Sequence, residues 1–177
     1  MKKQKEVYIG EVNPSPLGPI WVAVSDQGLV ALEFVDNKAV FIERMQRRGF
    51  QVVGLDSPLV AQAVQQVSEY LQGRRQIFDL PIDWSGMTAF QKKVLQETFV
   101  IPCGEVLTYG ELAQKVGKPR AARAVGRAEA TNPMPLVIPC HRVIGTDGKL
   151  HGYGGRGGLD TKAWLLRMEG AQIKAVR

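Results

Sequence analysis

The stretch LTYGELAQKVGKPRAARAVGRAEATNP, residues 107–133, decides the fold of the second half of this 177-residue chain. Its first part carries apolar residues at the spacing of one helix face, namely Leu112, Ala113 and Val116. Gly117-Lys118-Pro119 then predicts a turn, and the residues from about Pro119 to Ala130 predict a second helix. Two short helices joined by such a turn are typical of a helix-turn-helix, whose second helix enters a groove of DNA.

The second predicted helix has an uncommon surface for a protein that reads DNA. The side that would face DNA carries small residues, with Arg123 standing out between them: Ala121, Ala122, Ala124 and Gly126. Small residues let a helix approach closely, which suits the minor groove better than the major groove, where readers use Asn, Gln and Arg. Arginines on a helix more often form a solvated face, and these residues alone leave that alternative open.

The net charge of the chain is concentrated in its second half. The formal charge is +6, from 23 Lys and Arg and 17 Asp and Glu. Residues 1–81 hold nine basic and nine acidic side chains, whereas residues 82–177 hold fourteen basic and eight acidic ones. A basic half indicates a polyanionic partner, of which nucleic acid is the commonest. A generally basic surface without a specific partner is the alternative.

The first half predicts a small α/β unit. The runs VYIGEV, PIWVAVS and GLVALEF are rich in Val, Ile and aromatic residues, and turn-forming residues separate them, so we expect a small antiparallel sheet. A helix is predicted over residues 37–50, with an apolar face made by Val40, Phe41 and Met45. A second helix is predicted over residues 57–73, capped by Ser57 and ended by Gly73.

The segment RRQIFDLPIDWSGM, residues 74–87, is extended and contains a proline, which predicts a linker that still packs. We therefore expect an N-terminal α/β domain over residues 1–80 and a mostly helical domain over residues 81–177.

No apolar run approaches the roughly 20 residues that span a bilayer, so no membrane partner is expected. The N-terminus lacks the apolar core of a secretory signal, and only two cysteines occur, so we expect a reducing, cytoplasmic location.

The stretch IPCHRVIG, residues 138–145, places one of two cysteines beside one of two histidines. Cys140 could be a buried apolar residue, which is the default for a free cysteine. A disulfide with Cys103 fits poorly with a reducing location. A zinc site with Cys103, His141 and His151 has the wrong spacing, because structural zinc ligands come in pairs about two to five residues apart. No metal site is expected.

The remaining interpretation of Cys140 is a nucleophile. A thiol attacks as the thiolate, an imidazole such as His141 can take its proton, and a carboxylate can support that imidazole. Glu169, at the end of the predicted last helix, is the candidate carboxylate. Adjacent residues on an extended chain point to opposite faces, so His141 reaches Cys140 only through a turn or a bridging water. Spacing does not choose between these two geometries.

These motifs together resemble one family. IPCHRVIG is preceded by NPMPLV and by TYGELAQKVGKPRAARAVGRA, and it is followed by HGYGG and KAWLLRMEG. This series is similar to the O6-alkylguanine-DNA alkyltransferases, and the likeness extends over nearly the whole chain through SPLGPIWVAVSDQGLVALEF and FDLPIDWSGMTAFQKKVL. The resemblance implies a ribonuclease H-like N-terminal domain. It also implies a protein that flips O6-alkylguanine, and also O4-alkylthymine, out of double-stranded DNA.

The resemblance also implies roles for individual residues. Cys140 would accept the alkyl group, His141 would act as its base through water, and Glu169 would support His141. Asn132 would tie the recognition helix to the active-site loop. Tyr109 would help to turn the target nucleotide and would protonate the guanine, and Arg123 would fill the gap left by the flipped base.

The implied chemistry is used once per molecule. A thioether has no good leaving group, so alkylation of Cys140 would be permanent, and no cofactor or methyl donor other than DNA would be needed. We expect a monomer that binds through the minor groove, and leave cooperative binding open. Two alternatives are a non-catalytic lesion-binding relative, which would lack the acceptor cysteine, and a helix-turn-helix regulator, which would carry polar readout residues on its second helix.

The resemblance places the substrate base in a pocket lined by Val143 and Tyr153. The loop YGGRGGL after Tyr153 is about two residues longer than the family pattern, so either Gly154 or Arg156 would occupy the lid position over the alkylguanine. A second departure is Glu129, which we expect near the phosphate backbone, where its charge would weaken DNA binding modestly. The zinc site of some family members has no counterpart among the ligands available here.

Overall fold

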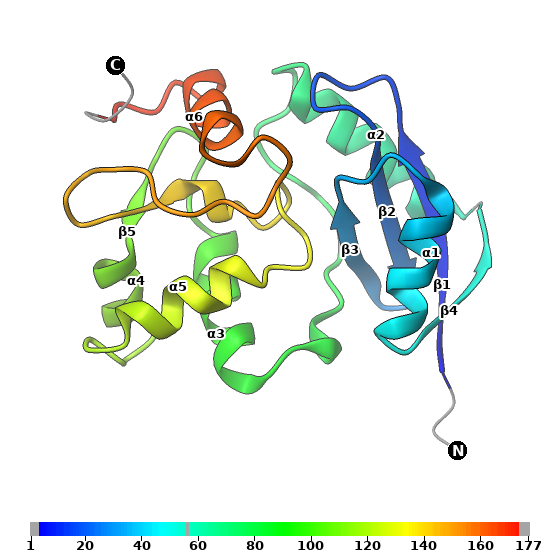
Figure 1. Cartoon of the computed structure of the whole chain (residues 1–177), viewed down its shortest axis with the longest axis horizontal. Helices are drawn as coiled ribbons and strands as arrows, with labels where there is room; N and C mark the ends of the chain where they lie inside the picture. The colour runs from blue at the N-terminus through cyan, green and yellow to red at the C-terminus, as the bar shows by residue number, and fades with distance from the viewer. Residues whose placement is uncertain (1–3, 56, 174–177) are drawn as a thin grey trace. The chain divides into compact units, whose positions relative to one another are not determined.

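The computed structural model describes residues 4–55 and 57–173, and the chain forms two compact units, Met1–Gly86 and Met87–Arg177 (Figure 1). The sequence predicted a boundary after residue 80, whereas the first unit also includes residues 81–86. Backbone hydrogen bonds to strand β3 (Gly28–Glu33) explain the difference: Leu29 donates a backbone hydrogen bond to the Pro81 carbonyl at 2.8 Å, and Asp83 donates one to the Leu29 carbonyl at 3.0 Å. The segment therefore continues the sheet instead of linking freely.

The first unit is built on a four-stranded sheet in the order β3-β2-β1-β4. Its strands are β1 (Lys5–Val12), β2 (Ile20–Ser25), β3 (Gly28–Glu33) and β4 (Phe50–Gly54). The three strands expected from the sequence pair antiparallel, but β4 pairs parallel with β1, so the sheet is mixed and the expectation of an antiparallel sheet was wrong. The helix between β3 and β4 carries the chain back across the sheet, and such a crossover produces a parallel pair.

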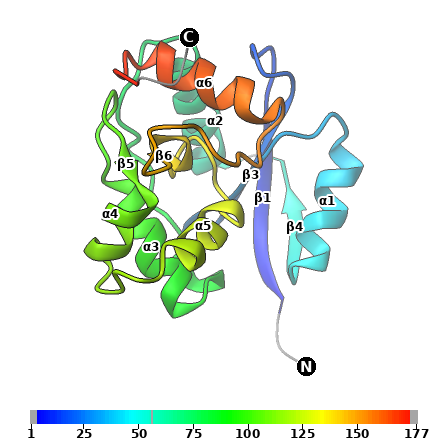
Figure 2. The same ribbon diagram turned by 60° about the vertical axis from the view of Figure 1, so that its left-hand side comes forward.

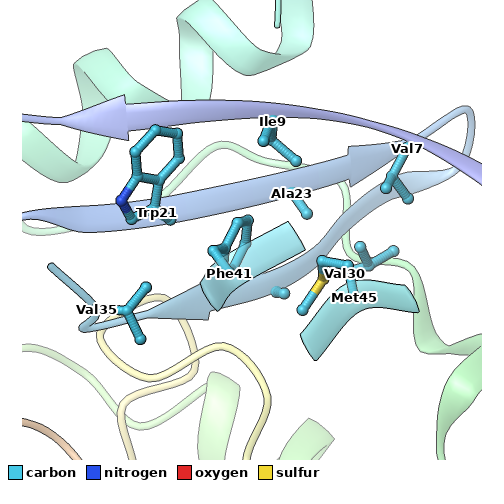
Figure 3. Packing of buried hydrophobic residues seen from close by; sticks show 9 residues of the cluster. Val7, Ile9, Trp21, Ala23, Val30, Val35, Phe41 and Met45 are labelled. Atoms are coloured by element: carbon cyan, nitrogen blue, oxygen red, sulfur yellow. The ribbon is translucent and has the colours of Figure 1, made fainter. Parts of the chain in front are cut away.

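Two helices pack on this sheet, α1 (Lys38–Arg47) and α2 (Pro58–Leu71). The Ser57 hydroxyl accepts a hydrogen bond from the Val60 amide, so the predicted cap of α2 is confirmed. Phe41 of α1 points into the core beside Trp21 of β2, and Met45 of α1 lies beside Val30 of β3 in the same cluster, as Figure 3 shows. Val40 is 39% exposed, so its predicted place on the buried face was wrong.

Helix α1 is shorter than predicted because residues 50–54 form strand β4. The sequence run FQVVG has the β-branched residues of a strand, but it follows directly on a helical pattern. Gly49 adopts a φ of 84°, a left-handed conformation that a glycine tolerates and that ends the helix. The apolar pattern of these five residues is too short to distinguish a strand from a continuation of the helix.

The second unit contains the predicted helix-turn-helix, and its helices are packed against one another (Figure 2). Its elements are α3 (Ala89–Phe99), β5 (Leu107–Thr108), α4 (Tyr109–Lys115), α5 (Ala122–Ala130), the 3-10 turn η2 (Cys140–Arg142), β6 (Val143–Ile144) and α6 (Gly158–Met168). Helix α5 begins at Ala122 instead of Pro119, because a turn in which the Ala121 amide donates to the Lys118 carbonyl precedes it. Strand β5 pairs with β6, which the sequence did not predict.

The core of the second unit lies between α3, α4 and α5. Its buried apolar members are Val94, Ile101, Leu112, Ala113, Val116, Val125, Ala128 and Val143. The three residues that the sequence assigned to the buried face of the first helix are all among them. Thr108 caps α4 through a capping box with Glu111, which fixes where the helix-turn-helix begins. No helix in the described part of the chain is long and apolar enough to cross a membrane.

Candidate active site

Cys140 and His141 lie on η2, a single tight turn. The Cys140 amide donates to the Ile138 carbonyl at 2.8 Å, and the Arg142 amide donates to the Pro139 carbonyl at 2.9 Å. Cys140 keeps 8% of its surface exposed, whereas His141 has none. The backbone therefore makes a turn at these two residues.

His141 is held by the carboxylate that the sequence singled out. Its Nε2 lies 2.8 Å from Glu169 Oε1, and Glu169 follows the last turn of α6. Arg142 also binds this carboxylate, with Nε 2.9 Å from Oε2 and Nη2 2.8 Å from Oε1. All three side chains are almost completely buried. The structure thus brings His141 and Glu169 together and adds a bidentate arginine that the sequence reasoning missed.

The protonation of this group follows from burial and pairing. Burial alone would raise the pKa of Glu169, but the hydrogen bonds from His141 and Arg142 hold it well below its usual range. Burial lowers the pKa of His141, against the opposing pull of Glu169. At neutral pH the site therefore holds a charged Glu169 and a neutral His141 that can accept a proton.

Asn132 connects the end of α5 to the turn that carries Cys140. Its Nδ2 donates to the Ile138 carbonyl at 2.8 Å, and its Oδ1 accepts from the Met134 amide at 3.0 Å. Its side chain also hydrogen-bonds to Cys140. The expected link between the recognition helix and the active-site turn is therefore present as geometry.

The Cys140 thiol lies in surroundings that disfavour its anion. Burial raises its pKa most, and the charge of Glu129 raises it further, to about 12. The hydrogen bond from Asn132 and the charge of Lys162 act in the opposite direction. Cys140 is therefore a thiol at neutral pH, and its ionisation needs a group that takes the proton.

Lys162 is a second charged residue that the sequence reasoning missed. It is fully buried on α6, and its Nζ donates to the carbonyls of Val143 at 2.7 Å and of His151 at 2.8 Å. It thereby joins β6 to the loop that follows. Burial lowers its pKa to about 8. Its spacing from Leu165 and Leu166, three and four residues later, was the available signal, because those residues form the buried face of α6.

Tyr109 begins α4 and lies beside the same loop. Its hydroxyl donates to the His151 carbonyl at 3.2 Å, and a side chain at Gly126 would meet its ring at 3.8 Å. Burial, and then the charges of Glu129 and Cys140, raise the pKa of Tyr109 to about 12. Gly126 therefore packs against Tyr109 in addition to lying on the predicted DNA-facing side.

A cavity of about 530 Å³ opens beside α5. It is lined by Tyr109, Gly110, Ala122, Arg123, Gly126, Gly145, Thr146, Asp147, His151 and Gly152. Four of these residues, Tyr109, Ala122, Arg123 and Gly126, were assigned from the sequence to DNA binding. Arg123 and Ala124 are exposed, whereas Ala121 and Ala122 are half-buried.

The predicted base-pocket residues lie apart from this cavity. Val143 is fully buried in the core, and Tyr153 has a buried hydroxyl with no hydrogen-bond partner among the described residues. Gly154 is exposed, and a side chain there would lie 3.7 Å from the Ala130 carbonyl at the end of α5. Arg156 instead accepts a hydrogen bond from Thr161 through its carbonyl, at the start of α6. The longer loop thus separates the two candidates for the lid position.

Glu129 does not face solvent. It keeps only 6% of its surface exposed, and its Oε1 lies 2.5 Å from the Thr98 hydroxyl of α3. The expectation that its charge lies near a phosphate backbone was wrong, because Glu129 falls on the side of α5 that packs against α3.

Within residues 4–55 and 57–173, no group of three or more His, Cys, Asp or Glu side chains is arranged to hold a metal ion.

Fold and site together define a helix-turn-helix protein with a buried cysteine beside a histidine–carboxylate pair. Sequence models of one family match both units: the ribonuclease-like domain of 6-O-methylguanine DNA methyltransferase over residues 7–84, and its DNA binding domain over residues 89–171. The chain belongs to the 6-O-methylguanine DNA methyltransferase family. The family identified from the sequence motifs, and the ribonuclease-like character expected of the first unit, are thereby confirmed.

Known relatives agree with this assignment. The methylated-DNA–protein-cysteine methyltransferase of Shigella flexneri is 38% identical over 161 residues, which cover 88% of this chain and 92% of the relative. The protein of the same name from Methanosarcina barkeri is 42% identical over 159 residues, covering 90% and 95%. The crystal structure of Mycobacterium tuberculosis O6-methylguanine methyltransferase matches with a TM-score of 0.75 at 36% identity and 93% coverage of each chain. The M. tuberculosis OGT structure in complex with DNA matches with a TM-score of 0.77.

Proposed function

We propose that this protein repairs O6-alkylguanine in double-stranded DNA by moving the alkyl group irreversibly onto Cys140. The observation that carries the proposal is the buried Cys140 on the same turn as His141, whose imidazole is paired with Glu169 at 2.8 Å. The carbon–sulfur bond forms as the carbon–oxygen bond of the lesion breaks. Guanine leaves with a proton, and Cys140 remains as a thioether, so each molecule acts once.

The first step is removal of the thiol proton. His141 is neutral and fully buried, so it can act as the base, and Glu169 stabilises the imidazolium that results. Arg142 keeps Glu169 ionised and oriented through its two hydrogen bonds. Transfer through a bridging water, as the family resemblance implies, stays part of this proposal.

The second step is protonation of the departing guanine. Tyr109 suits this role because its raised pKa keeps the phenol protonated, and because it lies on the wall of the cavity beside α5. To do so, its hydroxyl would give up its hydrogen bond to the His151 carbonyl and donate one to the guanine instead. Val143 and Tyr153 would contact the flipped base, and Gly154 or Arg156 would cover it. O4-alkylthymine would be a second substrate of the same pocket.

We infer that α5 binds the minor groove. Its small residues Ala121, Ala122 and Ala124 allow close approach, and the exposed Arg123 would take the place of the flipped base. The protein would act as a monomer in the cytoplasm, and its basic second half would contribute the salt-dependent attraction to phosphate. No cofactor takes part in the proposed reaction.

The test is a mass spectrum after incubation with a duplex that carries O6-methylguanine. We expect one added methyl group per chain, located on Cys140, with no further turnover when lesion DNA is in excess. Cys140→Ser should abolish the transfer, whereas Cys103→Ser should leave it intact. Repeated turnover, or a methyl group on Cys103, would contradict the proposal. Binding of the duplex without any methylation would instead indicate a lesion-binding protein.

A further inference from the structure

Glu129 is a buried carboxylate that the proposed reaction does not use. It lies on α5, its Oε1 contacts Thr98 Oγ1, and its Oε2 is buried with no hydrogen-bond partner among the described residues. A carboxylate in such a place is costly as an anion, because burial removes its hydration. It is tolerated only where neighbouring groups stabilise it or where it holds a proton.

The Thr98 hydroxyl allows Glu129 to be either charged or neutral. This hydroxyl lies 2.5 Å from Glu129 Oε1 and 3.0 Å from the Val94 carbonyl. A hydroxyl has one proton to donate and two lone pairs that accept. Thr98 can donate to a charged Glu129. It can also donate to Val94 and accept a hydrogen bond from a protonated Glu129, so the contact survives a change of protonation.

The charged and titratable neighbours of Glu129 are the groups of the active site. The charge of Glu129 acts on Tyr109 of α4 and on Cys140 of η2, and the charge of Lys162 of α6 acts on Glu129, while α3 contributes the neutral Thr98 that contacts it. Helix α5 itself connects them, because Gly126 packs on Tyr109 one turn before Glu129. Three residues after Glu129, Asn132 holds the turn that carries Cys140. Glu129 is therefore an electrostatic neighbour of the proposed nucleophile.

The opposing effects of these surroundings bring the pKa of Glu129 close to neutral pH. Burial raises its pKa to about 7, against the opposing effects of the Thr98 hydrogen bond and the Lys162 charge. The charge of Glu129 in turn raises the pKa of Cys140. The ionisations of the two groups are thus coupled, since two anions in one buried site repel each other.

We propose that Glu129 is a positioning residue that controls the ionisation of Cys140, so that the thiol readily loses its proton only while Glu129 holds one. This inference rests on the proposed role of Cys140 as the acceptor. When Glu129 is charged, formation of the thiolate is accompanied by proton uptake at Glu129, and the pair keeps one negative charge in total. When Glu129 is neutral, the thiol proton passes to His141 and no compensating uptake is needed.

The coupling gives the reaction a distinctive dependence on pH. Below about pH 7, where Glu129 is neutral, transfer of the thiol proton to His141 leaves the number of bound protons unchanged, so the thiolate population does not depend on pH. Above about pH 7 most molecules carry a charged Glu129, and the thiolate that needs a protonated Glu129 becomes about tenfold rarer for each pH unit. The rate of alkyl transfer should therefore be level below neutral pH and fall above it.

The experiment compares the full chain with Glu129→Gln from about pH 6 to about pH 9. Single-turnover methyl transfer from the O6-methylguanine duplex is measured together with alkylation of Cys140 by iodoacetamide in a Cys103→Ser background. Glu129→Gln should match the parent at about pH 6 and exceed it about tenfold at about pH 8 in both reactions. Glu105→Gln removes the same charge from an exposed position and should reproduce the parent profile.

Parallel profiles of the parent and Glu129→Gln at every pH would overturn the inference, even if Cys140 is methylated normally. Absence of methylation on Cys140 in the parent would instead overturn the proposed function, whatever the iodoacetamide profile. If Glu129→Gln does not fold, Glu129→Met replaces it, because methionine fills a buried site of this length without a polar group. The same divergence above neutral pH is then expected, and parallel profiles again contradict the inference.

Discussion

The two units of the molecule bury ionisable side chains in different ways. Among the described residues of the first unit, Asp83 is the one buried acidic or basic side chain, and both of its oxygens are bound. Lys5 lies 2.6 Å from Oδ2, and Ser25 and Ser85 donate to the two oxygens at 2.6 Å each. In the described part of the second unit, by contrast, Glu129, His141, Arg142 and Lys162 are buried around Cys140.

The difference lies between a charge that is fixed and groups that titrate near neutral pH. Despite burial, the hydrogen bonds of Lys5, Ser25 and Ser85 lower the pKa of Asp83 to about 2, so its charge is fixed over the ordinary pH range. The second unit instead holds groups whose pKa values are moved towards neutrality, about 7 for Glu129 and about 8 for Lys162. Groups that titrate near the working pH are those that can exchange protons during a reaction.

Glu169→Gln should have the largest effect, because it leaves Arg142 buried without a counter-charge. We expect a loss of about 3–5 kcal/mol in the free energy of unfolding and a loss of about a hundredfold or more in the rate of methyl transfer. Urea unfolding and single-turnover kinetics measure the two quantities. Glu105→Gln, an exposed change of the same kind, is the control. An unchanged rate would remove Glu169 from the proposed mechanism.

Arg123→Ala should reduce the reaction with duplex DNA by about tenfold to a hundredfold, because it removes a cation proposed to enter the groove. The reaction with free O6-benzylguanine, which needs no base flipping, should be nearly unchanged. Arg167→Ala removes an exposed arginine of α6 and controls for the loss of charge. Equal losses on the duplex and on the free base would place Arg123 in the chemistry instead of in DNA binding.

Asp83→Asn should have the smallest effect and should leave methyl transfer unchanged. The folded-state pKa of Asp83 lies below its ordinary value, so its charge stabilises the fold above about pH 4 and this stabilisation is lost as the pH falls towards about 2. We expect a loss of about 1–3 kcal/mol near neutral pH that shrinks on acidification. Unfolding curves at several pH values measure it. A loss independent of pH would mean that packing, and not charge, makes Asp83 important.

The elements predicted best from the sequence are those fixed by local signals. Ser57 caps its helix as predicted, because an N-cap bond forms within three residues of its own position. The first helix of the helix-turn-helix has the apolar face expected from its spacing. Strand β4 was missed because a strand gains its hydrogen bonds from β1, which lies more than forty residues away in sequence.

The site was predicted in part for the same reason. Cys140, His141 and Glu169 stand in motifs that can be read directly, and His141 and Glu169 do meet. Arg142 lies inside the same motif, yet its role depends on the distant end of α6. Glu129 was placed on the wrong side of α5, because the orientation of a nine-residue helix is decided by what packs against it.

The sequence by itself determined the family, the helix-turn-helix and the adjacent cysteine and histidine in IPCHRVIG, since these depend on residue types at short spacing. Only the tertiary structure decided which charges surround the thiol. Glu129 of α5 and Thr98 of α3 meet because these two helices pack together, and Lys162 comes from α6, which packs against the turn that carries Cys140. A pKa depends on burial and on neighbours in space, and neither can be read from the order of residues.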